Sequence, residues 1–177
     1  MVRRPPEMEL ALLGFLLHTP QHGYQIHQMV SDPSGLGLIW HIKQSQLYAL
    51  LNKLELDGYV TSVFQNQDPH PPRKVFELTN SGRVAFYEWL ASPVAAPRLV
   101  RQHFFAKLYF AQKEGVSVVR KLFDLQRVVC EGWLLEFEAD LSASKPTSFG
   151  WNMYRYRIGQ VRALYTWLKS YEFEGGG

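Results

Sequence analysis

Residues 43–60, KQSQLYALLNKLELDGYV, contain the segment that decides the predicted fold of this chain. Its leucines recur at the i, i+3, i+4 and i+7 positions of one helix face, as Leu47, Leu50, Leu51 and Leu54. Gly58 is placed to cap the C-terminus of this helix, which we expect over residues 44–57. The opposite face carries uncharged hydrogen-bonding groups and one tyrosine, which is typical of a surface that contacts a partner.

The segments around this helix predict a mostly α-helical domain with a small β-hairpin. Apolar residues at helical spacing predict helices over residues 7–18, 22–31 and 80–91. β-rich runs predict strands over residues 59–65 and 74–79, joined by the polar tip NQDPHPP at 66–72. Three helices followed by a hairpin is the order of a winged helix-turn-helix. In that design the third helix enters the DNA major groove and the hairpin, or wing, contacts the flanking backbone.

The second half of the chain predicts a separate helical domain. Residues 92–98, SPVAAPR, combine prolines with small residues and are expected to form a linker. Helices are predicted over residues 100–113, 116–141 and 149–171, and a disordered tail over residues 173–177. The predicted domains are therefore a winged helix-turn-helix over 1–91 and an α-helical dimerisation domain over 99–172. A helical domain of this size buries little surface per residue, so we expect a second copy to cover it.

The composition limits the class of protein. Hydrophobic residues make up 46% of the 177 residues, which is enough for a packed core. The longest apolar run, near residues 10–17, is too short to span a bilayer and lacks the cleavage site of a secretory signal. Cys130 is the only cysteine and lies within a helical apolar pattern. We therefore expect a buried, unreactive thiol, a cytoplasmic location and no membrane contact.

The charge of the chain gives little support to nucleic-acid binding. The formal net charge is +3, but residues 1–98 contain 8 Lys and Arg against 8 Asp and Glu. Residues 99–177 contain 11 basic against 8 acidic residues, so the excess lies outside the predicted DNA-binding half. An argument for DNA binding therefore depends on where individual charges lie.

Four segments of the first half resemble the PadR family of bacterial transcription regulators. They are ELALLGFL (9–16), TPQHGYQI (19–26), SQLYALLNKLELDGYV (45–60) and PRKVFELTNSGRVAFYEWL (72–90), in the order and spacing of that family. The second half resembles the AphA-like branch, more by pattern than by motif, in RQHFFAKLYFA (101–111), LFDLQ (122–126) and ALYTWLKSYE (163–172). The resemblance implies a homodimer held by its C-terminal helices, usually a repressor, and for many relatives a small, often aromatic, ligand.

The resemblance also implies that the turn at residues 44–46 faces the bases. Glutamine pairs bidentately with adenine, and serine serves donor or acceptor edges, so Gln44, Ser45 and Gln46 are expected to specify sequence. Many relatives have Pro-Gly-Thr at these three positions. The DNA sequence that this chain contacts therefore cannot be taken from the family.

Other matching positions are expected to contact phosphates, which position the protein without reading sequence. Tyr48 matches a family tyrosine that touches the backbone, and Arg73 and Lys74 lie at the wing. Further DNA-binding residues are expected on the third helix, namely Lys43, Asn52 and Lys53. Arg3 and Arg4 form a basic arm that adds to this set.

Each assignment has a simpler alternative. Tyr48 could be a partly buried aromatic, Arg73 and Lys74 plain solubilising charge at a hairpin edge, and residues 44–46 a polar first turn. For the whole protein, the alternative is a dimeric adaptor whose winged helix binds protein; clustering of Lys43 with Tyr48, Arg73 and Lys74 would argue against it. The sequence has no nucleophile elbow, phosphate loop or dinucleotide fingerprint, so no enzyme activity is expected.

The aromatic residues of the second half predict a core and, as a further hypothesis, a ligand pocket. At helical spacing, aromatics are more often core or dimer contacts, although one seam can serve both purposes. The candidate pocket for a small aromatic effector consists of Phe105, Tyr109, Trp133, Trp151, Tyr154 and Arg155.

The histidines do not predict a metal site. No pair has HExxH or Cys-His spacing, so neither a metal nor another cofactor is expected. His22-Gly23-Tyr24 matches a family motif that opens the second helix, and there Tyr24 is expected to pack against the core.

Overall fold

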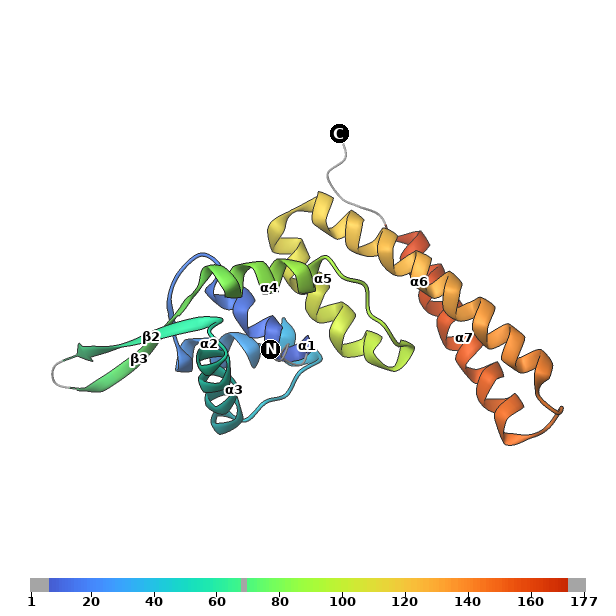
Figure 1. Cartoon of the computed structure of the whole chain (residues 1–177), viewed down its shortest axis with the longest axis horizontal. Coiled ribbons are helices and arrows are strands. Elements are labelled where there is room, and N and C mark those ends of the chain that lie inside the picture. Colours follow the sequence, from blue (N-terminus) through green and yellow to red (C-terminus); the bar gives the residue numbers. More distant parts are fainter. Residues whose placement is uncertain (1–6, 68–69, 172–177) are drawn as a thin grey trace. The chain divides into compact units, whose positions relative to one another are not determined.

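The computed structural model describes residues 7–67 and 70–171, and its element order confirms the predicted fold class (Figure 1). The α-helices are α1 (Glu7–Leu10), α2 (Gly23–Val30), α3 (Gln44–Leu56), α4 (Asn80–Leu90), α5 (Phe105–Glu114), α6 (Val116–Ala143) and α7 (Phe149–Ser170). The 3-10 turns are η1 (Ala11–Leu16), η2 (Leu36–Leu38) and η3 (Pro97–Leu99), and η4 (Val100–Phe104) is a π turn. The strands are β1 (Gln21–His22), β2 (Val60–Gln67) and β3 (His70–Leu78).

The chain divides into two compact units. The first, which we call the head, contains the chain up to Ala91 together with Arg101–Phe110. The second, which we call the hairpin unit, contains Ser92–Val100 together with the chain from Ala111 onward. The predicted basic arm at Arg3 and Arg4 and the predicted tail at residues 173–177 lie outside the described residues.

Aromatic rings form the core of the head. The ring of Phe110 in α5 meets Phe15 of η1 edge-on at 5.2 Å and Phe86 of α4 at 5.5 Å between centroids. Trp89 of α4 joins the same cluster, 6.2 Å from Phe110. All four rings are buried. The cluster therefore ties the start of the chain to α4 and α5, and supports the elements that carry the candidate site.

The predicted first helix, over residues 7–18, is wrong in its length and type. α1 ends at Leu10, and the chain continues to Leu16 as the 3-10 turn η1. Residues 10–13 and 15–17 are all buried. A segment covered on nearly every side is shaped by its packing, which overrides the local helical pattern that the prediction used.

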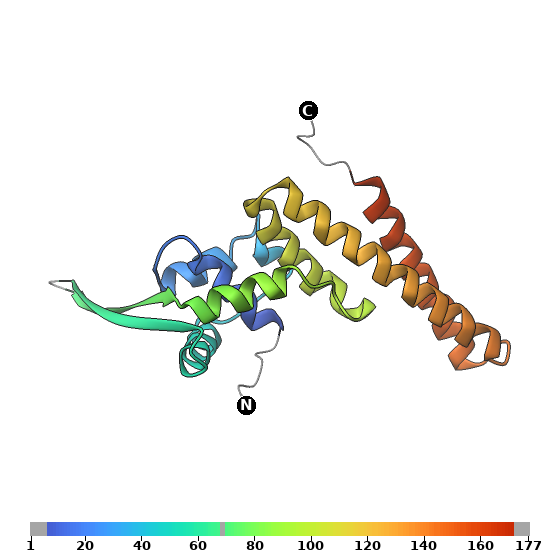
Figure 2. The ribbon, with the colours of Figure 1, turned by 45° about the horizontal axis from the view of Figure 1, so that its top comes forward.

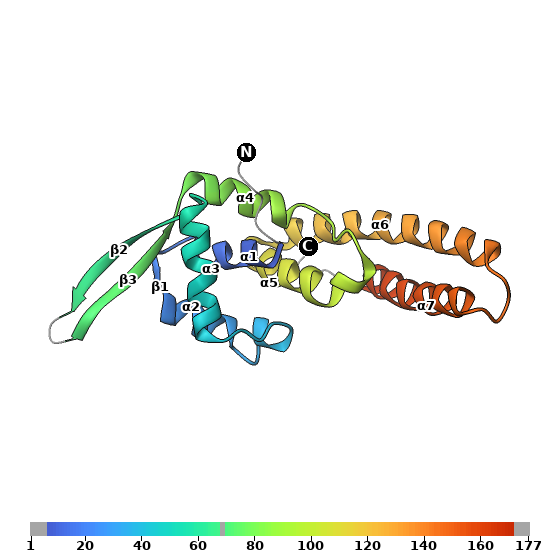
Figure 3. The same ribbon diagram turned by 60° about the horizontal axis from the view of Figure 1, so that its bottom comes forward.

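The sheet is antiparallel, in the order β1-β3-β2. The predicted strands of the wing are confirmed, but they extend to Gln67 and back to His70, into the segment predicted as a polar tip. β1 was not predicted, because two residues are too few to display alternation. It lies along β3, with Gln21 opposite Phe76 and His22 opposite Val75 (Figure 3).

α3 ends one residue before the predicted boundary. Of the four leucines of the predicted apolar face, Leu47, Leu51 and Leu54 are completely buried, whereas Leu50 is half-buried. The backbone of Gly58 has a φ of +79°, and its N–H donates to the Glu55 carbonyl at 3.0 Å. This left-handed cap, which glycine adopts without steric cost, ends the helix and directs the chain into β2.

The hairpin unit is built on two antiparallel helices, α6 and α7, which lie side by side (Figure 2). Both predicted helices are confirmed to within two residues. The Ser148 hydroxyl accepts a hydrogen bond from the Trp151 N–H at 3.2 Å and caps α7. The buried apolar residues of the two helices are Val119, Leu122, Phe123, Cys130, Trp133, Ile158, Val161 and Leu168. Cys130 is therefore buried, as predicted.

The segment between α4 and α5 differs from its prediction. The chain over 100–113 is not one α-helix, because it begins with the π turn η4 and becomes α-helical only at Phe105. Before it, Val94 is completely buried. Its N–H donates to Gln126 Oε1 at 2.8 Å, and its carbonyl accepts from Gln126 Nε2 at 3.4 Å. The buried amide of Gln126 thus satisfies both backbone groups of Val94 and anchors the predicted linker to α6.

Over the two described stretches, no helix is long and apolar enough to cross a membrane. Nor do the described residues include a group of three or more His, Cys, Asp or Glu side chains that could hold a metal ion.

Candidate nucleic-acid interface

The first turn of α3 presents the three residues predicted to contact bases. Gln44, Ser45 and Gln46 are all exposed. The Oε1 atom of Gln46 accepts a hydrogen bond from the Lys43 N–H at 3.1 Å, which caps the helix. The Nε2 group is therefore the end of Gln46 that could bind a base edge without breaking the cap. No hydrogen bond described for this part of the chain restrains the side chain of Gln44 or Ser45.

Tyr48 lies one turn further along α3 and is half-buried. A Cβ atom at Gly23 would lie only 2.5 Å from the Tyr48 ring, so the ring packs directly on the backbone that opens α2. The same ring also lines a cavity. The two interpretations offered for Tyr48, packing and contact with a partner, are therefore compatible.

Lys74 of the wing is held by α3. Its Nζ donates to Glu55 Oε2 at 2.6 Å and to Asn52 Oδ1 at 3.0 Å, and lies 5.0 Å from the centroid of the Phe76 ring. The hydrogen bond from Lys74 and then that from Ser62 lower the pKa of Glu55 below its ordinary value. The Lys74 charge is therefore balanced locally by an ionised carboxylate.

Lys53 is also paired within the head. Its Nζ lies 2.6 Å from Oε2 of Glu9, a largely buried carboxylate on α1. Lys43 and Arg73, in contrast, are exposed and form no ion pair with a carboxylate of residues 7–67 or 70–171. Of the cations predicted to contact phosphates, these two are the ones that bind no acidic partner in the described part of the chain.

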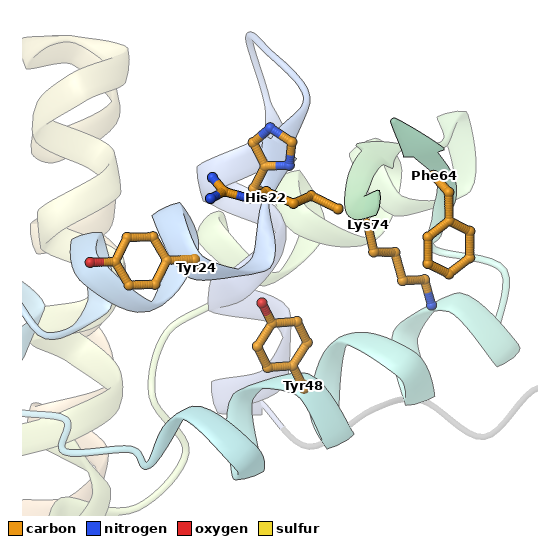
Figure 4. Close-up of a pocket in the computed structure, with 6 residues that line it drawn as sticks. His22, Tyr24, Tyr48, Phe64 and Lys74 are labelled. Carbon is orange, nitrogen blue, oxygen red and sulfur yellow. The ribbon is translucent and has the colours of Figure 1, made fainter. Parts of the chain in front are cut away.

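A cavity of about 650 Å³ lies between α2, α3 and the wing. It brings together three predicted residues, Tyr48, Arg73 and Lys74, with three that were not predicted, His22, Tyr24 and Phe64. Figure 4 shows Tyr48 pointing from α3 toward β1 and His22, while Phe64 and Lys74 extend from the wing toward the same helix. Lys43, Gln44, Ser45, Gln46, Asn52 and Lys53 are not among the residues that line this cavity.

The unpredicted residues enter the site through long-range pairing. β1 places His22 beside β3, and the wing ladder places Phe64 opposite Lys74. Tyr24 does not pack against the core as predicted, because its side chain is 52% exposed and its hydroxyl accepts a hydrogen bond from Gln28 at 2.9 Å. For Phe64, the one signal available in the sequence was an aromatic residue within a predicted wing strand. The alternation of side chains along a strand does not show which face of the sheet is covered.

The candidate effector residues are divided between the two units. Phe105 and Tyr109 belong to the head, whereas the others belong to the hairpin unit. Trp133 is buried, Trp151 and Tyr154 are half-buried, and the Arg155 guanidinium lies 4.5 Å from the Trp151 ring centroid. None of the six lines the cavity described above or a second one of about 430 Å³ beside Trp40 and Gln46. The effector pocket stays a prediction.

Comparisons with known proteins relate the chain to transcriptional regulators. Residues 12–88 match the model of the family described as the transcriptional regulator PadR-like family. The chain is 25% identical over 173 residues to the negative transcriptional regulator PadR of Bacillus subtilis, covering 92% of this chain and 94% of that protein. It is 26% identical over 88 residues to a probable transcriptional regulator of Mycobacterium tuberculosis, covering 50% of this chain and 46% of that protein.

Solved structures include the same Bacillus subtilis protein. Its crystal structure in complex with operator DNA is 25% identical, covers 92% of this chain and 96% of that one, and has a TM-score of 0.48. Its complex with p-coumaric acid is 26% identical, covers 95% and 96% of the two chains, and has a TM-score of 0.42.

Proposed function

Through residues 12–88 this chain belongs to the PadR-like family of transcriptional regulators, and from that premise we propose that it is a homodimeric, DNA-binding repressor released by a small aromatic ligand. It acts on duplex promoter DNA in the cytoplasm. The proposal assigns base contacts to the first turn of α3 and backbone contacts to Tyr48, Arg73 and Lys43.

The observation that carries DNA binding is the convergence of Tyr48, Arg73 and Lys74 on one cavity beside the uncharged face of α3. An exposed helix rich in amide and hydroxyl groups suits the donor and acceptor pattern of the major groove. The exposed guanidinium of Arg73 suits a phosphate on the flanking backbone. Three of the four groups whose clustering would favour DNA over a protein partner, Tyr48, Arg73 and Lys74, line this cavity, whereas Lys43 does not, and the net charge of this half is zero.

Exposed apolar side chains on α6 and α7 support a dimer through the hairpin unit. They are Val128, Leu135, Phe149 and Tyr156. A helix pair that leaves such side chains in water gains stability when a second copy covers them. A two-fold dimer also presents two copies of α3, which suits half-sites about 34 Å apart, one turn of DNA.

The sequence likeness to Bacillus subtilis PadR, which has been crystallised with p-coumaric acid, supports an aromatic effector. We assign it to the candidate residues of the hairpin unit, Trp133, Trp151, Tyr154 and Arg155, where Arg155 would neutralise the carboxylate of an aromatic acid. Calorimetric titration with phenolic acids tests this assignment. Heat that disappears in Arg155→Ala supports it, and no heat with any phenolic acid contradicts it.

A binding assay against genomic fragments, beginning with the promoter upstream of the chain's own gene, tests the function itself. We expect one fragment to bind tightly, to be competed poorly by random DNA, and to weaken as salt rises. Tyr48→Phe, which keeps the ring on Gly23 and removes only the hydroxyl, should weaken all fragments alike. Gln44→Ala should instead change which fragment is preferred.

Weak and equal binding to every fragment, with and without candidate ligands, would contradict sequence-specific regulation. That result would favour the adaptor alternative. Arg73→Ala provides a second check, because losing one phosphate contact per subunit should reduce the slope of log affinity against log salt by about 0.9 per contact.

A further inference from the structure

Phe64 lies on the face of the wing that is turned toward α3. In the β2–β3 ladder Phe64 is opposite Lys74, and Ser62, two residues earlier on the same face, is opposite Phe76. Both Ser62 and Lys74 donate hydrogen bonds to Glu55 of α3, which establishes the direction of this face. Phe64 is one position further along β2 on the same side.

Phe64 combines an exposed side chain with a place in the candidate site. Its side chain is 72% exposed, although it lines the cavity with Tyr48, Arg73 and Lys74. A single exposed apolar side chain is ordinary on a protein surface. Phe64 differs because it lines one cavity together with Tyr24 and Tyr48, so its ring adds apolar surface to the candidate site. Figure 4 shows the ring extending from the wing beside the Lys74 side chain, toward α3.

The charge of Lys74, which is opposite Phe64 in the ladder, is balanced before any partner binds. The Nζ atom of Lys74 is 2.6 Å from the Glu55 carboxylate. Lys74 is therefore poorly suited to clamp a phosphate by charge alone, in contrast to Arg73, which forms no ion pair within the described residues. Phe64 is suited to an apolar contact, because deoxyribose rings and base edges offer apolar surface to an inserted side chain.

We propose that Phe64 is an apolar DNA contact that inserts its ring into the minor groove flanking the segment bound by α3. The inference rests on the proposed DNA-binding function. When α3 occupies the major groove, the wing lies over the neighbouring backbone and the adjacent minor groove. Phenylalanine is among the side chains that proteins insert between base steps from the minor groove. Phe64 is thereby a specificity-determining residue at base pairs that α3 does not contact.

A contact of this kind has a distinct salt dependence. Burying an uncharged ring releases no counterions, so Phe64→Ala should lower affinity by the same factor at every salt concentration. Loss of a largely buried phenylalanine contact corresponds to a decrease in affinity on the order of tenfold. Arg73→Ala, in contrast, should change the slope of the salt dependence.

Val63 provides a matched control within the same strand. It is 61% exposed, but it is opposite Val75 and so lies on the other face of the ladder. Equilibrium binding of the wild-type chain, Phe64→Ala, Phe64→Leu and Val63→Ala to one footprinted fragment should be measured at several salt concentrations. We expect a parallel, roughly tenfold loss for Phe64→Ala, a smaller loss for Phe64→Leu, and none for Val63→Ala.

A change in the DNA locates the contact. Replacing guanine by inosine in the flanking base pairs removes the 2-amino group from the minor groove and leaves the major groove unaltered. The substitution should alter wild-type affinity and leave that of Phe64→Ala unchanged. Equal responses of the two proteins would overturn the minor-groove placement.

The binding measurements distinguish failure of the proposed function from failure of the inference about Phe64. If the wild-type chain shows no preference among DNA fragments, the proposed function fails, and the role of Phe64 fails with it. If the wild-type chain prefers one fragment and Phe64→Ala binds it equally well, only the inference about Phe64 is wrong. A loss of DNA affinity in Phe64→Ala that is accompanied by a change in the slope of log affinity against log salt also contradicts the inference, because the side chain would then be acting through neighbouring charges.

Discussion

The head and the hairpin unit differ in how their surface charges are arranged. In the head, Lys74 pairs with Glu55 and Lys53 with Glu9, whereas Lys43 and Arg73 form no ion pair within the described residues. In the hairpin unit, residues 149–171 contain four basic and no acidic residues, and Arg162 among them pairs with Glu138 of α6 at 2.8 Å. Exposed apolar side chains also remain on α6 and α7, such as Phe149, which is 82% exposed.

This difference suits the two units to different kinds of partner. The head has an aromatic core, and its surface combines unpaired cations and uncharged polar groups with single exposed apolar side chains such as Leu56 and Phe64. The hairpin unit has a narrow core between two helices and leaves apolar surface available. A surface defined by placed polar groups suits a partner with its own hydrogen-bonding pattern, whereas apolar helix faces suit a second copy of the chain.

The largest expected effect is on the core of the head. Phe110→Ala removes a buried ring that meets Phe15, Phe86 and Trp89, so the free energy of unfolding should fall by about 3–5 kcal/mol. Urea denaturation of the single-site variant measures this. Phe149→Ala is the control from the hairpin unit, and it should change the stability of the isolated chain by about 0.5 kcal/mol or less. Similar losses of unfolding free energy for Phe110→Ala and Phe149→Ala would contradict this difference between the core of the head and the exposed face of the hairpin unit.

A smaller effect on stability is expected at Gln126 of the hairpin unit. Gln126→Leu keeps the side-chain volume but leaves the buried N–H and carbonyl of Val94 without their partner, which should cost about 1–3 kcal/mol. Thermal denaturation followed by circular dichroism measures the loss. Gln160→Leu, at an exposed position of α7, should be nearly neutral. A neutral Gln126→Leu would mean that water or another group satisfies Val94.

A smaller effect on stability, but a clear one on DNA binding, is expected at Glu55. Glu55→Gln removes the charge that balances Lys74, which leaves the Lys74 ammonium available to a phosphate. DNA affinity should therefore rise, and its salt dependence should steepen by the equivalent of about one phosphate contact per subunit. Glu77→Gln is the matched control, since Glu77 is exposed on the other face of β3. Equal increases from both variants would indicate a general charge effect.

The same carboxylate gives a pH dependence of known sign. Because the pKa of Glu55 is lowered in the folded chain, its pairing stabilises the fold above the ordinary glutamate pKa. That stabilisation is lost as pH falls through the lowered value. The group is partly exposed, so the effect should be about 0.5 kcal/mol. The unfolding free energies of the wild-type chain and Glu55→Gln should converge as the pH is lowered below the ordinary glutamate pKa, and curves that stay parallel there would contradict the pairing.

The smallest expected effect concerns the chemical reactivity of the Cys130 thiol. Burial raises the pKa of its thiol to about 11, so the reactive thiolate is scarce at neutral pH. Iodoacetamide should label the native chain slowly and the urea-unfolded chain rapidly, as measured by mass spectrometry. Rapid labelling of the native chain would show that the narrow core of the hairpin unit opens readily.

Local features of the sequence were enough to predict the order of elements and much of the site. The leucine spacing of α3 and the glycine after it are local signals, because a helix repeats every few residues and a left-handed cap requires no distant contact. The wing strands and the α6–α7 pair followed in the same way. For the same reason the amide-rich first turn of α3 and the position of Tyr48 off its apolar face could be predicted from the sequence alone.

Only the tertiary structure decided which of these groups meet. The pairing of β1 with β3 brought His22 to the wing, and the ladder register turned Phe64 toward α3. The Glu9–Lys53 pair joins residues far apart in the chain, so no local pattern could have shown that Lys53 is engaged. The buried turn η1 lost its helical form for a related reason, because contacts from distant elements surround it. Periodicity therefore determined what each segment of this protein is, whereas long-range packing determined which charges and rings are available to a partner.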